Sequence, residues 1–482
     1  MRLTLLSVCM ALAVSGCTMT PDLVRPPLPV TATYPSEQSA FDALPVMDLG
    51  WRTMFGDPRL QALIDLALQN NRDLRLATLN VEAVQAQYRI QRAEQLPSVG
   101  ATGNHVRQRV AAVGDTVPAI QKQTALSVGL SSFELDLWGR VRSMSDAAFA
   151  RYLASEEGRR AAQISLVAAV ADAYFAERLA QEQSELTAQT LANWTEYRDM
   201  ALRLKSAGQN NGLDIAQAES QVARARADIE ARSREAQRAR NALVQLVGTD
   251  LAESSLPVPL SLQHQPIMTR LPAGVPSDLL VRRPDIRQAE RQLEAANADI
   301  GAARAAFFPT ISLTASTGYA SASMGGLFKS DNRTWSFAPQ ITIPLFNGGR
   351  LRAELRLSEL RKSAAVAEYE RAIQIAFREV SDGLAGSATY GRQIEAQAQV
   401  VAQETRRLDL SNQRYRAGVD GRLEWLDAQR QLYTAQQGML DLRRQEISNA
   451  VALYKSLGGG LNAVSSVATD ARQDAVRPAN AM

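Results

Sequence analysis

The chain contains the same segment twice, and this duplication limits its possible folds more than any other feature. Residues 71–99 match 283–311 at a constant spacing of 212 residues, and 205–219 match 415–429 at a spacing of 210. Two unbroken matches at nearly one spacing indicate a duplicated structural unit. We therefore expect one architecture built twice, although a length of 482 residues alone would suggest two or three separate domains.

Each half has the same expected order of elements. A helix ends before Pro97 or Pro309, two strand-like segments follow around a glycine-rich turn, and a long helix and a return helix complete the half. Large apolar residues alternate most clearly in 335–345, where Pro339 and Pro344 predict a local irregularity. The expected strands are 98–111, 122–137, 311–319 and 335–345.

The long helices are expected at 140–205 and 350–415, and each would extend for ~100 Å if unbroken. Gly383, Gly386 and Gly391 argue against a straight second long helix. The return helices are expected at 213–248 and 422–457. In the second of these, a seven-residue repeat favours left-handed coiled packing. Its members are Leu426, Tyr433, Leu440, Ile447 and Tyr454.

The first sixteen residues read as a signal peptide, because one positive charge precedes an apolar run and small residues. After cleavage, Cys17 would be the sole cysteine and the first residue, so no intramolecular disulfide can form. The ending "VSGC" resembles the bacterial lipoprotein signal, in which the cysteine is lipidated. A chance cysteine near an ordinary cleavage site is the alternative. Thr18 stands where, by that resemblance, an aspartate would retain the protein in the inner membrane.

Composition excludes several classes of protein. With 53 basic and 50 acidic residues, the chain lacks the charge excess that drives nucleic-acid binding, and its 6% aromatic content suits long helices. No stretch of 18 consecutive apolar residues follows the signal peptide, so any membrane span must consist of strands. Four strands cannot close a membrane barrel, whereas three copies provide twelve and two copies eight. The alternative is a soluble coiled-coil protein with small hairpins, such as a periplasmic scaffold.

Several motifs resemble the outer-membrane factor family of TolC-like channels, specifically the OprM-type lipoproteins of tripartite multidrug efflux pumps. They include "DLWGRVR" (136–142), "VRRPDIRQAE" (281–290), "ANADIGAARAAFFPTISLT" (296–314), "RYRAGVD" (414–420) and "LYKSLGGG" (453–460). The resemblance implies an α+β membrane protein. It implies a trimeric 12-stranded transmembrane β-barrel, four strands per protomer, that is continuous with a long periplasmic α-helical barrel. It also implies an equatorial region to which the linker and both chain ends contribute.

The expected division of the chain follows from the duplication and the resemblance. The segments are a signal peptide (1–16), a lipid anchor and extended segment (17–59), the first repeat (60–250), a proline-rich equatorial linker (251–284), the second repeat (285–460) and a disordered tail (461–482).

Two carboxylates, Glu424 and Asp427, lie three residues apart and so on one face of the last helix. One interpretation is that they stabilise the first helical turn through the helix dipole. The family resemblance places them instead in rings at the periplasmic pore constriction, with Leu423 as an apolar gate residue. Acidic rings favour cations over anions.

The resemblance also implies a gate lock, in which Arg414 and Tyr415 link to the neighbouring hairpin at Asp214. Asn211 and Asp214 have the spacing of a helix cap as well, and this interpretation stays open. The hairpin tips, Ala207-Gly208 and Ala417-Gly418, turn the chain and by resemblance meet the periplasmic adaptor protein.

The resemblance implies an outer-membrane exit duct that passively conducts drugs and other small molecules and is gated at its periplasmic tip. Its expected partners are two further copies of the chain, a periplasmic adaptor, an inner-membrane RND transporter and outer-membrane lipid. Type I secretion or metal-ion efflux is the alternative. We expect no cofactor, no nucleic acid and no enzymatic activity, because His105 and His264 stand apart from any catalytic motif.

Overall fold

The chain divides into two compact units. The computed structural model describes residues 18–31, 49–111, 119–208, 211–271, 282–419 and 422–464. The first unit comprises Met1–Pro27, Asn80–Glu156 and Gln288–Arg371, and the second comprises Leu28–Leu79, Glu157–Arg287 and Ala372–Met482. A β-sheet and the helices next to it form the first unit, and two helical hairpins with their connecting segments form the second.

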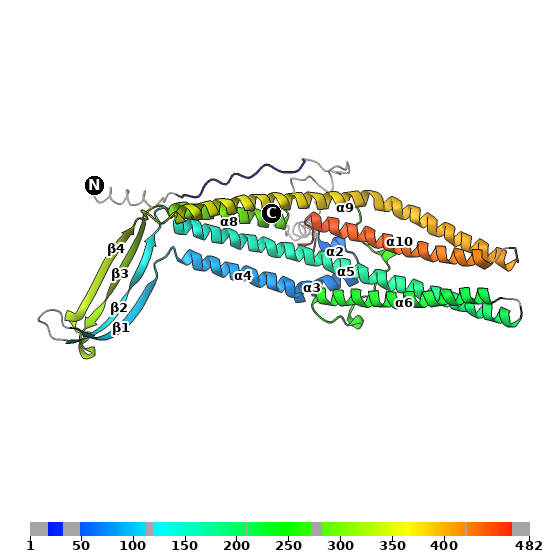
Figure 1. The fold of residues 1–482 in the computed structure, drawn as a ribbon, viewed down its shortest axis with the longest axis horizontal. Coiled ribbons are helices and arrows are strands. Elements are labelled where there is room, and N and C mark those ends of the chain that lie inside the picture. The colour runs from blue at the N-terminus through cyan, green and yellow to red at the C-terminus, as the bar shows by residue number, and fades with distance from the viewer. Residues whose placement is uncertain are drawn as a thin grey trace, which may run out of the picture. The chain divides into compact units, whose positions relative to one another are not determined.

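The same order of elements occurs twice along the chain (Figure 1). After the short helices α2 (Trp51–Met54) and α3 (Pro58–Asn70), the first series is α4 (Arg72–Ala93), β1 (Val99–Val110), β2 (Ala119–Leu135), α5 (Arg140–Ser206) and α6 (Gly212–Val247). The second series is α8 (Pro284–Ala305), β3 (Thr310–Ser321), β4 (Arg333–Thr342), α9 (Arg350–Arg416) and α10 (Arg422–Ser456). The predicted helices and strands are confirmed to within a few residues, whereas the predicted domain boundaries stay a prediction.

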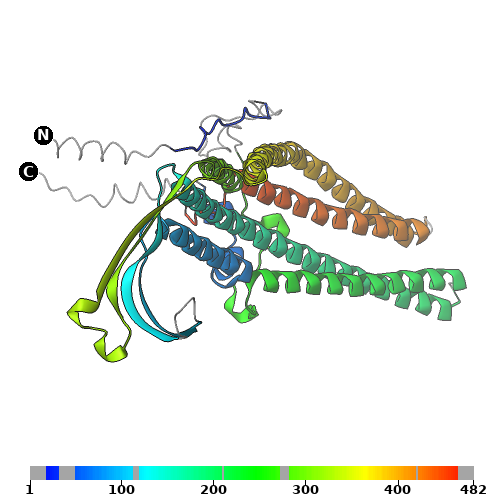
Figure 2. The same cartoon turned by 60° about the vertical axis from the view of Figure 1, so that its left-hand side comes forward.

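The four strands form one antiparallel sheet in the order β1-β2-β3-β4, and Figure 2 shows that the sheet is curved. The pairing separates its side chains into two faces. On the polar face, the residues are small or uncharged except Glu134. They are Gly100, Thr102, Asn104, Val106, Gln108, Gln121, Gln123, Ala125, Ser127, Gly129, Glu134, Ser312, Thr314, Ser316, Gly318, Ala320, Thr334, Ser336, Ala338, Gln340 and Thr342.

The opposite, apolar face carries large hydrophobic side chains over most of its length. They include Val99, Leu126, Val128, Leu130, Phe133, Leu135, Ile311, Leu313, Tyr319, Trp335, Phe337 and Ile341. Trp335 is 78% exposed and Ile341 63% exposed. A face of this kind requires an apolar environment, because exposed apolar surface on this scale is unfavourable in water.

The register shift of the sheet lies in β2, so the predicted irregularity is wrong for Pro339, whereas the expected strand does stop short of Pro344. Pro339 pairs with Leu313 in an unbroken register, and β4 ends at Thr342, before Pro344. An edge strand tolerates proline, and β4 is at the edge of this sheet. The register shifts between Leu130 and Phe133, where Ser132 has a positive φ of 52°.

The N-terminal segment of the first unit lies against helices that adjoin the sheet. Thr20 Oγ1 is 3.2 Å from Ser143 Oγ, near the start of α5, and Asn297 Nδ2 of α8 donates to the Pro21 carbonyl over 2.7 Å. A Cβ atom at Gly301 would come 2.2 Å from Thr20 Oγ1, so only glycine permits this approach. The contacts fix the extended segment to α8 close to the point where β2 leads into α5.

In the second unit, the two hairpins pack through α5 and α10. Gln183 donates to Asp441 over 2.8 Å, and Thr187 Oγ1 lies 2.9 Å from the Tyr433 hydroxyl. The members of the seven-residue repeat in α10 are buried or half-buried, which agrees with the predicted coiled packing. Among the described residues, no helix has both the length and the apolar character that crossing a membrane requires.

The proline-rich linker meets the described segments that begin at residue 49 and end at residue 464 in the second unit. Glu253 forms ion pairs with Arg59 of α3 and Arg240 of α6, each at 2.6 Å. The Trp51 amide donates to the Asn462 carbonyl over 2.9 Å. The Tyr174 hydroxyl donates to buried Asp57 over 2.6 Å, and burial raises the pKa of Tyr174 far above its ordinary value.

Two glycines in α9 allow α10 to approach closely. The helix continues without interruption through Gly383 and Gly386. A Cβ atom at Gly386 would be 2.2 Å from Asn449 Oδ1, and the Asn449 amide already donates to the Gly383 carbonyl over 3.0 Å. These glycines therefore serve helix packing rather than a break in the helix.

We predict that Gly386→Ala will destabilise the protein by about 1–3 kcal/mol, because the added methyl group overpacks the α9–α10 contact. Thermal unfolding followed by far-UV circular dichroism would measure the change. Gly391→Ala in the same helix is the control, since its Cβ would meet only Arg270 Nη2 at 3.6 Å. Equal melting temperatures for the two variants would show that the close approach at Gly386 contributes nothing.

Candidate functional site

Both helical hairpins end in exposed turns that require glycine. Gly208 has a φ of 73° and Gly418 a φ of 71°, a conformation that side chains rarely adopt. At the second tip, the Val419 amide donates to the Arg414 carbonyl and the Gly418 amide to the Tyr415 carbonyl, each over 3.0 Å. These two bonds form a Schellman motif. The described residues of both tips, Ala207-Gly208 and Ala417-Gly418, are therefore exposed, and both glycines have a left-handed backbone conformation.

The predicted capping role of Asn211 is confirmed at the start of α6. Its side-chain oxygen accepts a hydrogen bond from the Asp214 amide over 2.9 Å. The Asp214 carboxylate is half-buried in the first turn, where negative charge interacts favourably with the helix dipole. This local role does not depend on any contact between Asp214 and another hairpin.

The two predicted constriction carboxylates meet at a single guanidinium group. Arg407 Nη2 of α9 lies 2.7 Å from Glu424 Oε1 and 2.9 Å from Asp427 Oδ2. Arg430, one turn further along α10, contacts the other Asp427 oxygen at 2.5 Å. Glu424, Asp427, Arg407 and Arg430 form a four-residue network, which we call the tip network, and Glu404 of α9 lies beside it at 3.7 Å from Arg407 Nη1.

This network changes the protonation behaviour of its members. The hydrogen bond to Arg407 is the main cause that lowers the pKa of Asp427 below its ordinary value. Hydrogen bonds to Glu424 and then Asp427 raise the pKa of Arg407. Asp427 is therefore ionised at neutral pH beside the guanidinium groups of Arg407 and Arg430, which the two acidic residues alone do not reveal.

An aromatic cluster beside the tip network joins the two hairpins. Trp425 of α10 lies edge-to-face with Tyr197 of α5 at 5.3 Å and stacks with Tyr415 of α9 at 5.9 Å between ring centroids. Leu426 is buried in the same cluster. Consecutive residues of α10 thus have different tasks, because Trp425 and Leu426 pack on the first hairpin while their neighbours bind Arg407.

The structure brings some of the predicted site residues together and places others apart. It brings Glu424 and Asp427 together, and it places Tyr415 against Trp425. Leu423 is 69% exposed beside them. Arg414 is in the last turn of α9, and Asp214 belongs to the other hairpin. The predicted lipidation site, Cys17, lies outside the described residues.

Sequence reasoning missed Arg407 and Arg430. The spacing of three residues between Asp427 and Arg430 was a usable signal. Arg407 is 17 and 20 residues from its partners, so its role depends on how α9 and α10 align across the turn.

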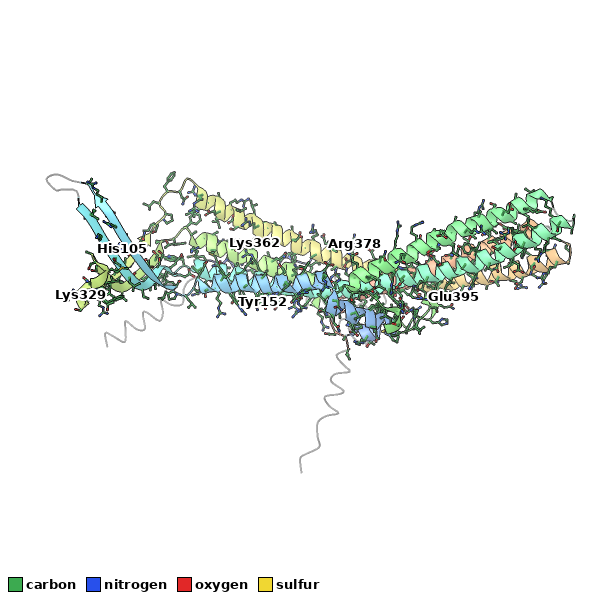
Figure 3. All side chains as sticks on the ribbon, turned by 90° about the horizontal axis from the view of Figure 1, so that it is seen from below. His105, Tyr152, Lys329, Lys362, Arg378 and Glu395 are labelled. Carbon is green, nitrogen blue, oxygen red and sulfur yellow. The ribbon has the colours of Figure 1, made fainter. Side chains whose placement is uncertain are left out.

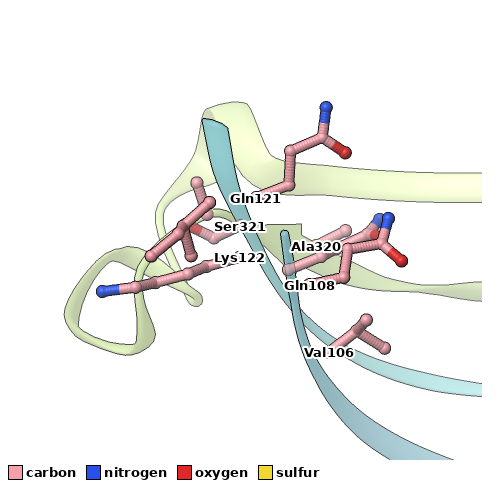
Figure 4. A pocket seen from close by; sticks show the side chains of 9 residues that line it. Val106, Gln108, Gln121, Lys122, Ala320 and Ser321 are labelled. Atoms are coloured by element: carbon pink, nitrogen blue, oxygen red, sulfur yellow. The ribbon is translucent and has the colours of Figure 1, made fainter. Parts of the chain in front are cut away.

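The two histidines and a hollow on the sheet are the other candidate sites. His105 Nδ1 is 2.8 Å from Thr124 Oγ1 on the sheet, where Figure 3 labels it, and His264 contacts Ser261 in the linker. In the part of the chain that the structure describes, no group of three or more His, Cys, Asp or Glu side chains could hold a metal ion. An open hollow of about 520 Å³ at the turn end of the sheet (Figure 4) is lined by Val106, Gln108, Ile120, Gln121, Lys122, Gln123, Ala320, Ser321 and Ala322.

We predict that the Arg407–Asp427 pair stabilises the hairpin by about 0.5 kcal/mol at neutral pH, since both side chains are partly exposed. Because the pKa of Asp427 is lowered by folding, this stabilisation is present above the ordinary value of about 3.9 and disappears as the pH falls through the lowered value. A double-mutant cycle with Arg407→Gln and Asp427→Asn, read by thermal unfolding at pH 7 and pH 2, would measure it. Coupling that persists at pH 2 would contradict the ion pair.

The chain matches one protein family over almost its whole length. The family model for outer membrane efflux proteins matches residues 63–249 and 275–459. The probable efflux pump outer membrane protein TtgC of Pseudomonas putida is 45% identical over 460 residues, covering 93% of this chain and 94% of TtgC. The outer membrane protein OprJ of Pseudomonas aeruginosa is 42% identical over 452 residues, covering 93% of this chain and 94% of OprJ.

Solved structures agree with the sequence relatives. The open state of the MtrE outer membrane channel of Neisseria gonorrhoeae has a TM-score of 0.87 and 41% identity, covering 93% of this chain and 100% of that chain. The solved structure of CusC, a protein that forms a transmembrane channel, has a TM-score of 0.83 and 38% identity, covering 92% of this chain and 100% of that chain. The chain belongs to the outer membrane efflux protein family, with the α+β fold of the TolC-like outer membrane channels.

Proposed function

We propose that three copies of this chain close a twelve-stranded barrel in the outer membrane and form a passive exit duct for drugs and organic solvents, gated at the helical hairpin tips. The two-faced sheet is the observation that carries this proposal. Its polar face would line the duct and its apolar face would contact lipid.

The strand lengths and the open edges support assembly around an axis. The strands contain 10 to 17 residues, and a tilted strand needs ~9–11 to cross a bilayer. β1 and β4 each have one edge without a strand partner among the described residues of this chain. An unpaired edge is not tolerated in lipid, so β4 of one copy would pair with β1 of the next.

The names of the relatives support small molecules as the cargo. Relatives at 45% identity are called an antibiotic efflux pump protein, a toluene efflux pump protein and a solvent efflux pump protein. We infer that this chain likewise serves a pump assembled with a periplasmic adaptor and an inner-membrane RND transporter. The energy would come from the transporter, and the duct itself would perform no chemistry and need no cofactor.

The N-terminal segment supports a lipid anchor at Cys17. Residues 20 and 21 contact α5 and α8 within the unit that contains the sheet. Arg25 adds an ion pair with Glu290 at 2.8 Å. An acyl chain on the preceding cysteine would therefore start from a segment already bound beside the strands, and several acyl chains would give stable anchoring.

The tip network supports a gate whose charge depends on conformation. Three-fold symmetry would make rings of Glu424 and Asp427, with Leu423 as an apolar ring beside them. While Arg407 binds both carboxylates, the rings are compensated. Movement of α9 relative to α10 would release the carboxylates and make the entrance more cation-selective. Asp214, Arg414 and Tyr415 would hold neighbouring hairpins together in the closed state.

The first test is single-channel conductance of the purified protein in a planar bilayer under a salt gradient. We expect small, cation-selective currents. Arg407→Gln should raise the ratio of cation to anion permeability and Asp427→Asn should lower it, each by about fivefold, because one unit charge at ~4 Å in water contributes ~1 kcal/mol.

Arg406→Gln is the matched control, since it removes an exposed positive charge next to Arg407 without touching either carboxylate. Opposite shifts in the two test variants and little change in the control would support the tip network as the selectivity element. Unchanged selectivity in both test variants would exclude it. Failure of the unmutated protein to insert would contradict the barrel.

A second prediction concerns the tips as the adaptor-binding surface. Gly418→Val should reduce site-specific crosslinking to the periplasmic adaptor about tenfold, because a side chain in the left-handed conformation costs ~1–2 kcal/mol and distorts the turn. Arg352→Gln, at an exposed position near the other end of α9, should crosslink normally. Normal crosslinking by a folded Gly418→Val protein would show that the tip shape is not recognised.

A further inference from the structure

We propose that the turn end of the sheet binds the phosphate groups of an outer-leaflet membrane lipid through four cations, Arg107, Arg109, Lys122 and Arg333, which we call the rim cations. The inference rests on the proposed function, because it takes the apolar face as the surface that contacts lipid. It adds to that surface a binding site for the phosphate groups of lipid headgroups.

The strand register places all four cations on the apolar face. Arg107 pairs directly with Lys122, and Arg109 pairs with Ile120. Arg333 pairs with Tyr319, which also pairs with Leu126. Figure 4 shows the Lys122 side chain pointing away from Gln108 and Gln121 of the polar face. The strand register thus places the rim cations on the face opposite to the one that would line the duct, although Lys122 also borders the hollow beside Gln108 and Gln121.

The rim cations lie where the apolar band ends. On β3, apolar positions extend from Ile311 to Tyr319, about 27 Å along the strand. This length is of the order of the ~25 Å apolar band of outer-membrane barrels. Tyr319 at its end packs edge-to-face on Phe328 at 5.6 Å, as expected for aromatic residues at a membrane surface.

The rim cations lack partners within the described part of the chain. All four are exposed, and none of their side chains takes part in an ion pair or hydrogen bond there. Arg107 and Lys122 are like charges directly opposite each other, which destabilises a strand pair. At the opposite end of the sheet, by contrast, Arg140 is paired with Glu134 at 2.6 Å.

The acidic residues near this end do not compensate the four charges. Asp331, in the turn between β3 and β4, has a side-chain hydrogen bond with Ser330. Exposed Lys329, labelled at this end in Figure 3, adds another positive charge to the same turn. Asp115 in the β1–β2 connection lies outside the described residues. The described part of this end therefore carries a positive excess that an external anion would balance.

A phosphorylated lipid headgroup fits this arrangement better than a soluble anion. The cations border a surface that must lie in lipid, so an anion that binds them would sit at the membrane surface. Guanidinium groups bind phosphate oxygens in pairs of hydrogen bonds, and two phosphates on one headgroup could contact cations on different strands. In the closed barrel, Arg333 of one copy would also face the β1 edge of the next copy at the same end.

The test measures binding of fluorescent lipid A with two phosphates to the full-length protein in detergent. Arg107→Gln combined with Lys122→Gln should weaken binding about 30-fold, because two cations near an anionic lipid headgroup are lost. The control is Arg226→Gln combined with Arg352→Gln, two exposed arginines on helices, which should bind as the unmutated protein does. Lipid A stripped of its phosphates should bind weakly to all forms.

Unchanged affinity in the rim variant, or equal binding of phosphate-free lipid A, would overturn the proposal. Inorganic phosphate in excess is the second arm. Persistent lipid A binding would support a lipid site, and displacement would assign the cations to free phosphate instead. Conductance of the same preparations separates the proposed duct from the proposed lipid site. If the rim variant conducts and also binds lipid A as tightly as the unmutated protein, only the lipid site is contradicted. A protein that never inserts contradicts the duct.

Discussion

The unsatisfied edges of the four-stranded sheet are the constraint on which the remaining structure depends. Each edge strand presents peptide groups that water cannot solvate once the apolar face enters lipid. A sheet of four strands is too small to close on itself, so the edges of different copies must satisfy one another. The requirement for several copies follows from this local hydrogen-bonding need.

In the proposed duct, the hairpins of the helical unit would have to pack firmly and still be able to separate. Glycines at 383 and 386 allow α10 to lie directly on α9, while polar pairs such as Gln183 with Asp441 join α5 to α10. Near the second turn, Trp425 and Leu426 provide apolar contacts between the hairpins, and the tip network provides charged contacts between α9 and α10.

The elements of the fold followed from the sequence because their signals are periodic and local. Alternation of residues identified the strands, and the duplicated segments located the helices in both halves. The bulge at Ser132 could not be predicted, since it reflects how β2 fits β3 rather than any local pattern. Pro339 misled the prediction, because its pairing with Leu313 leaves the register between β3 and β4 unbroken.

The candidate site was predictable only in part, because some of its contacts join different helices and leave no local pattern in the sequence. Glu424 and Asp427 share a helix face, so their proximity could be derived from their spacing. Arg407 reaches them from the antiparallel helix, and only the alignment of α9 with α10 reveals the contact. The sequence of α10 alone shows two carboxylates without an obvious partner. The structure pairs both of them with Arg407 of α9.

Charged side chains are paired in the tip network, whereas the rim cations are not paired with one another or with described acidic residues. At the turn between α9 and α10, positive and negative side chains of the same chain bind one another. At the turn end of the sheet, the cations have no described partner in the chain and repel one another. Charges of one sign persist beside an apolar band at low cost only where the surroundings supply the opposite sign, and a membrane surface with phosphate groups does so.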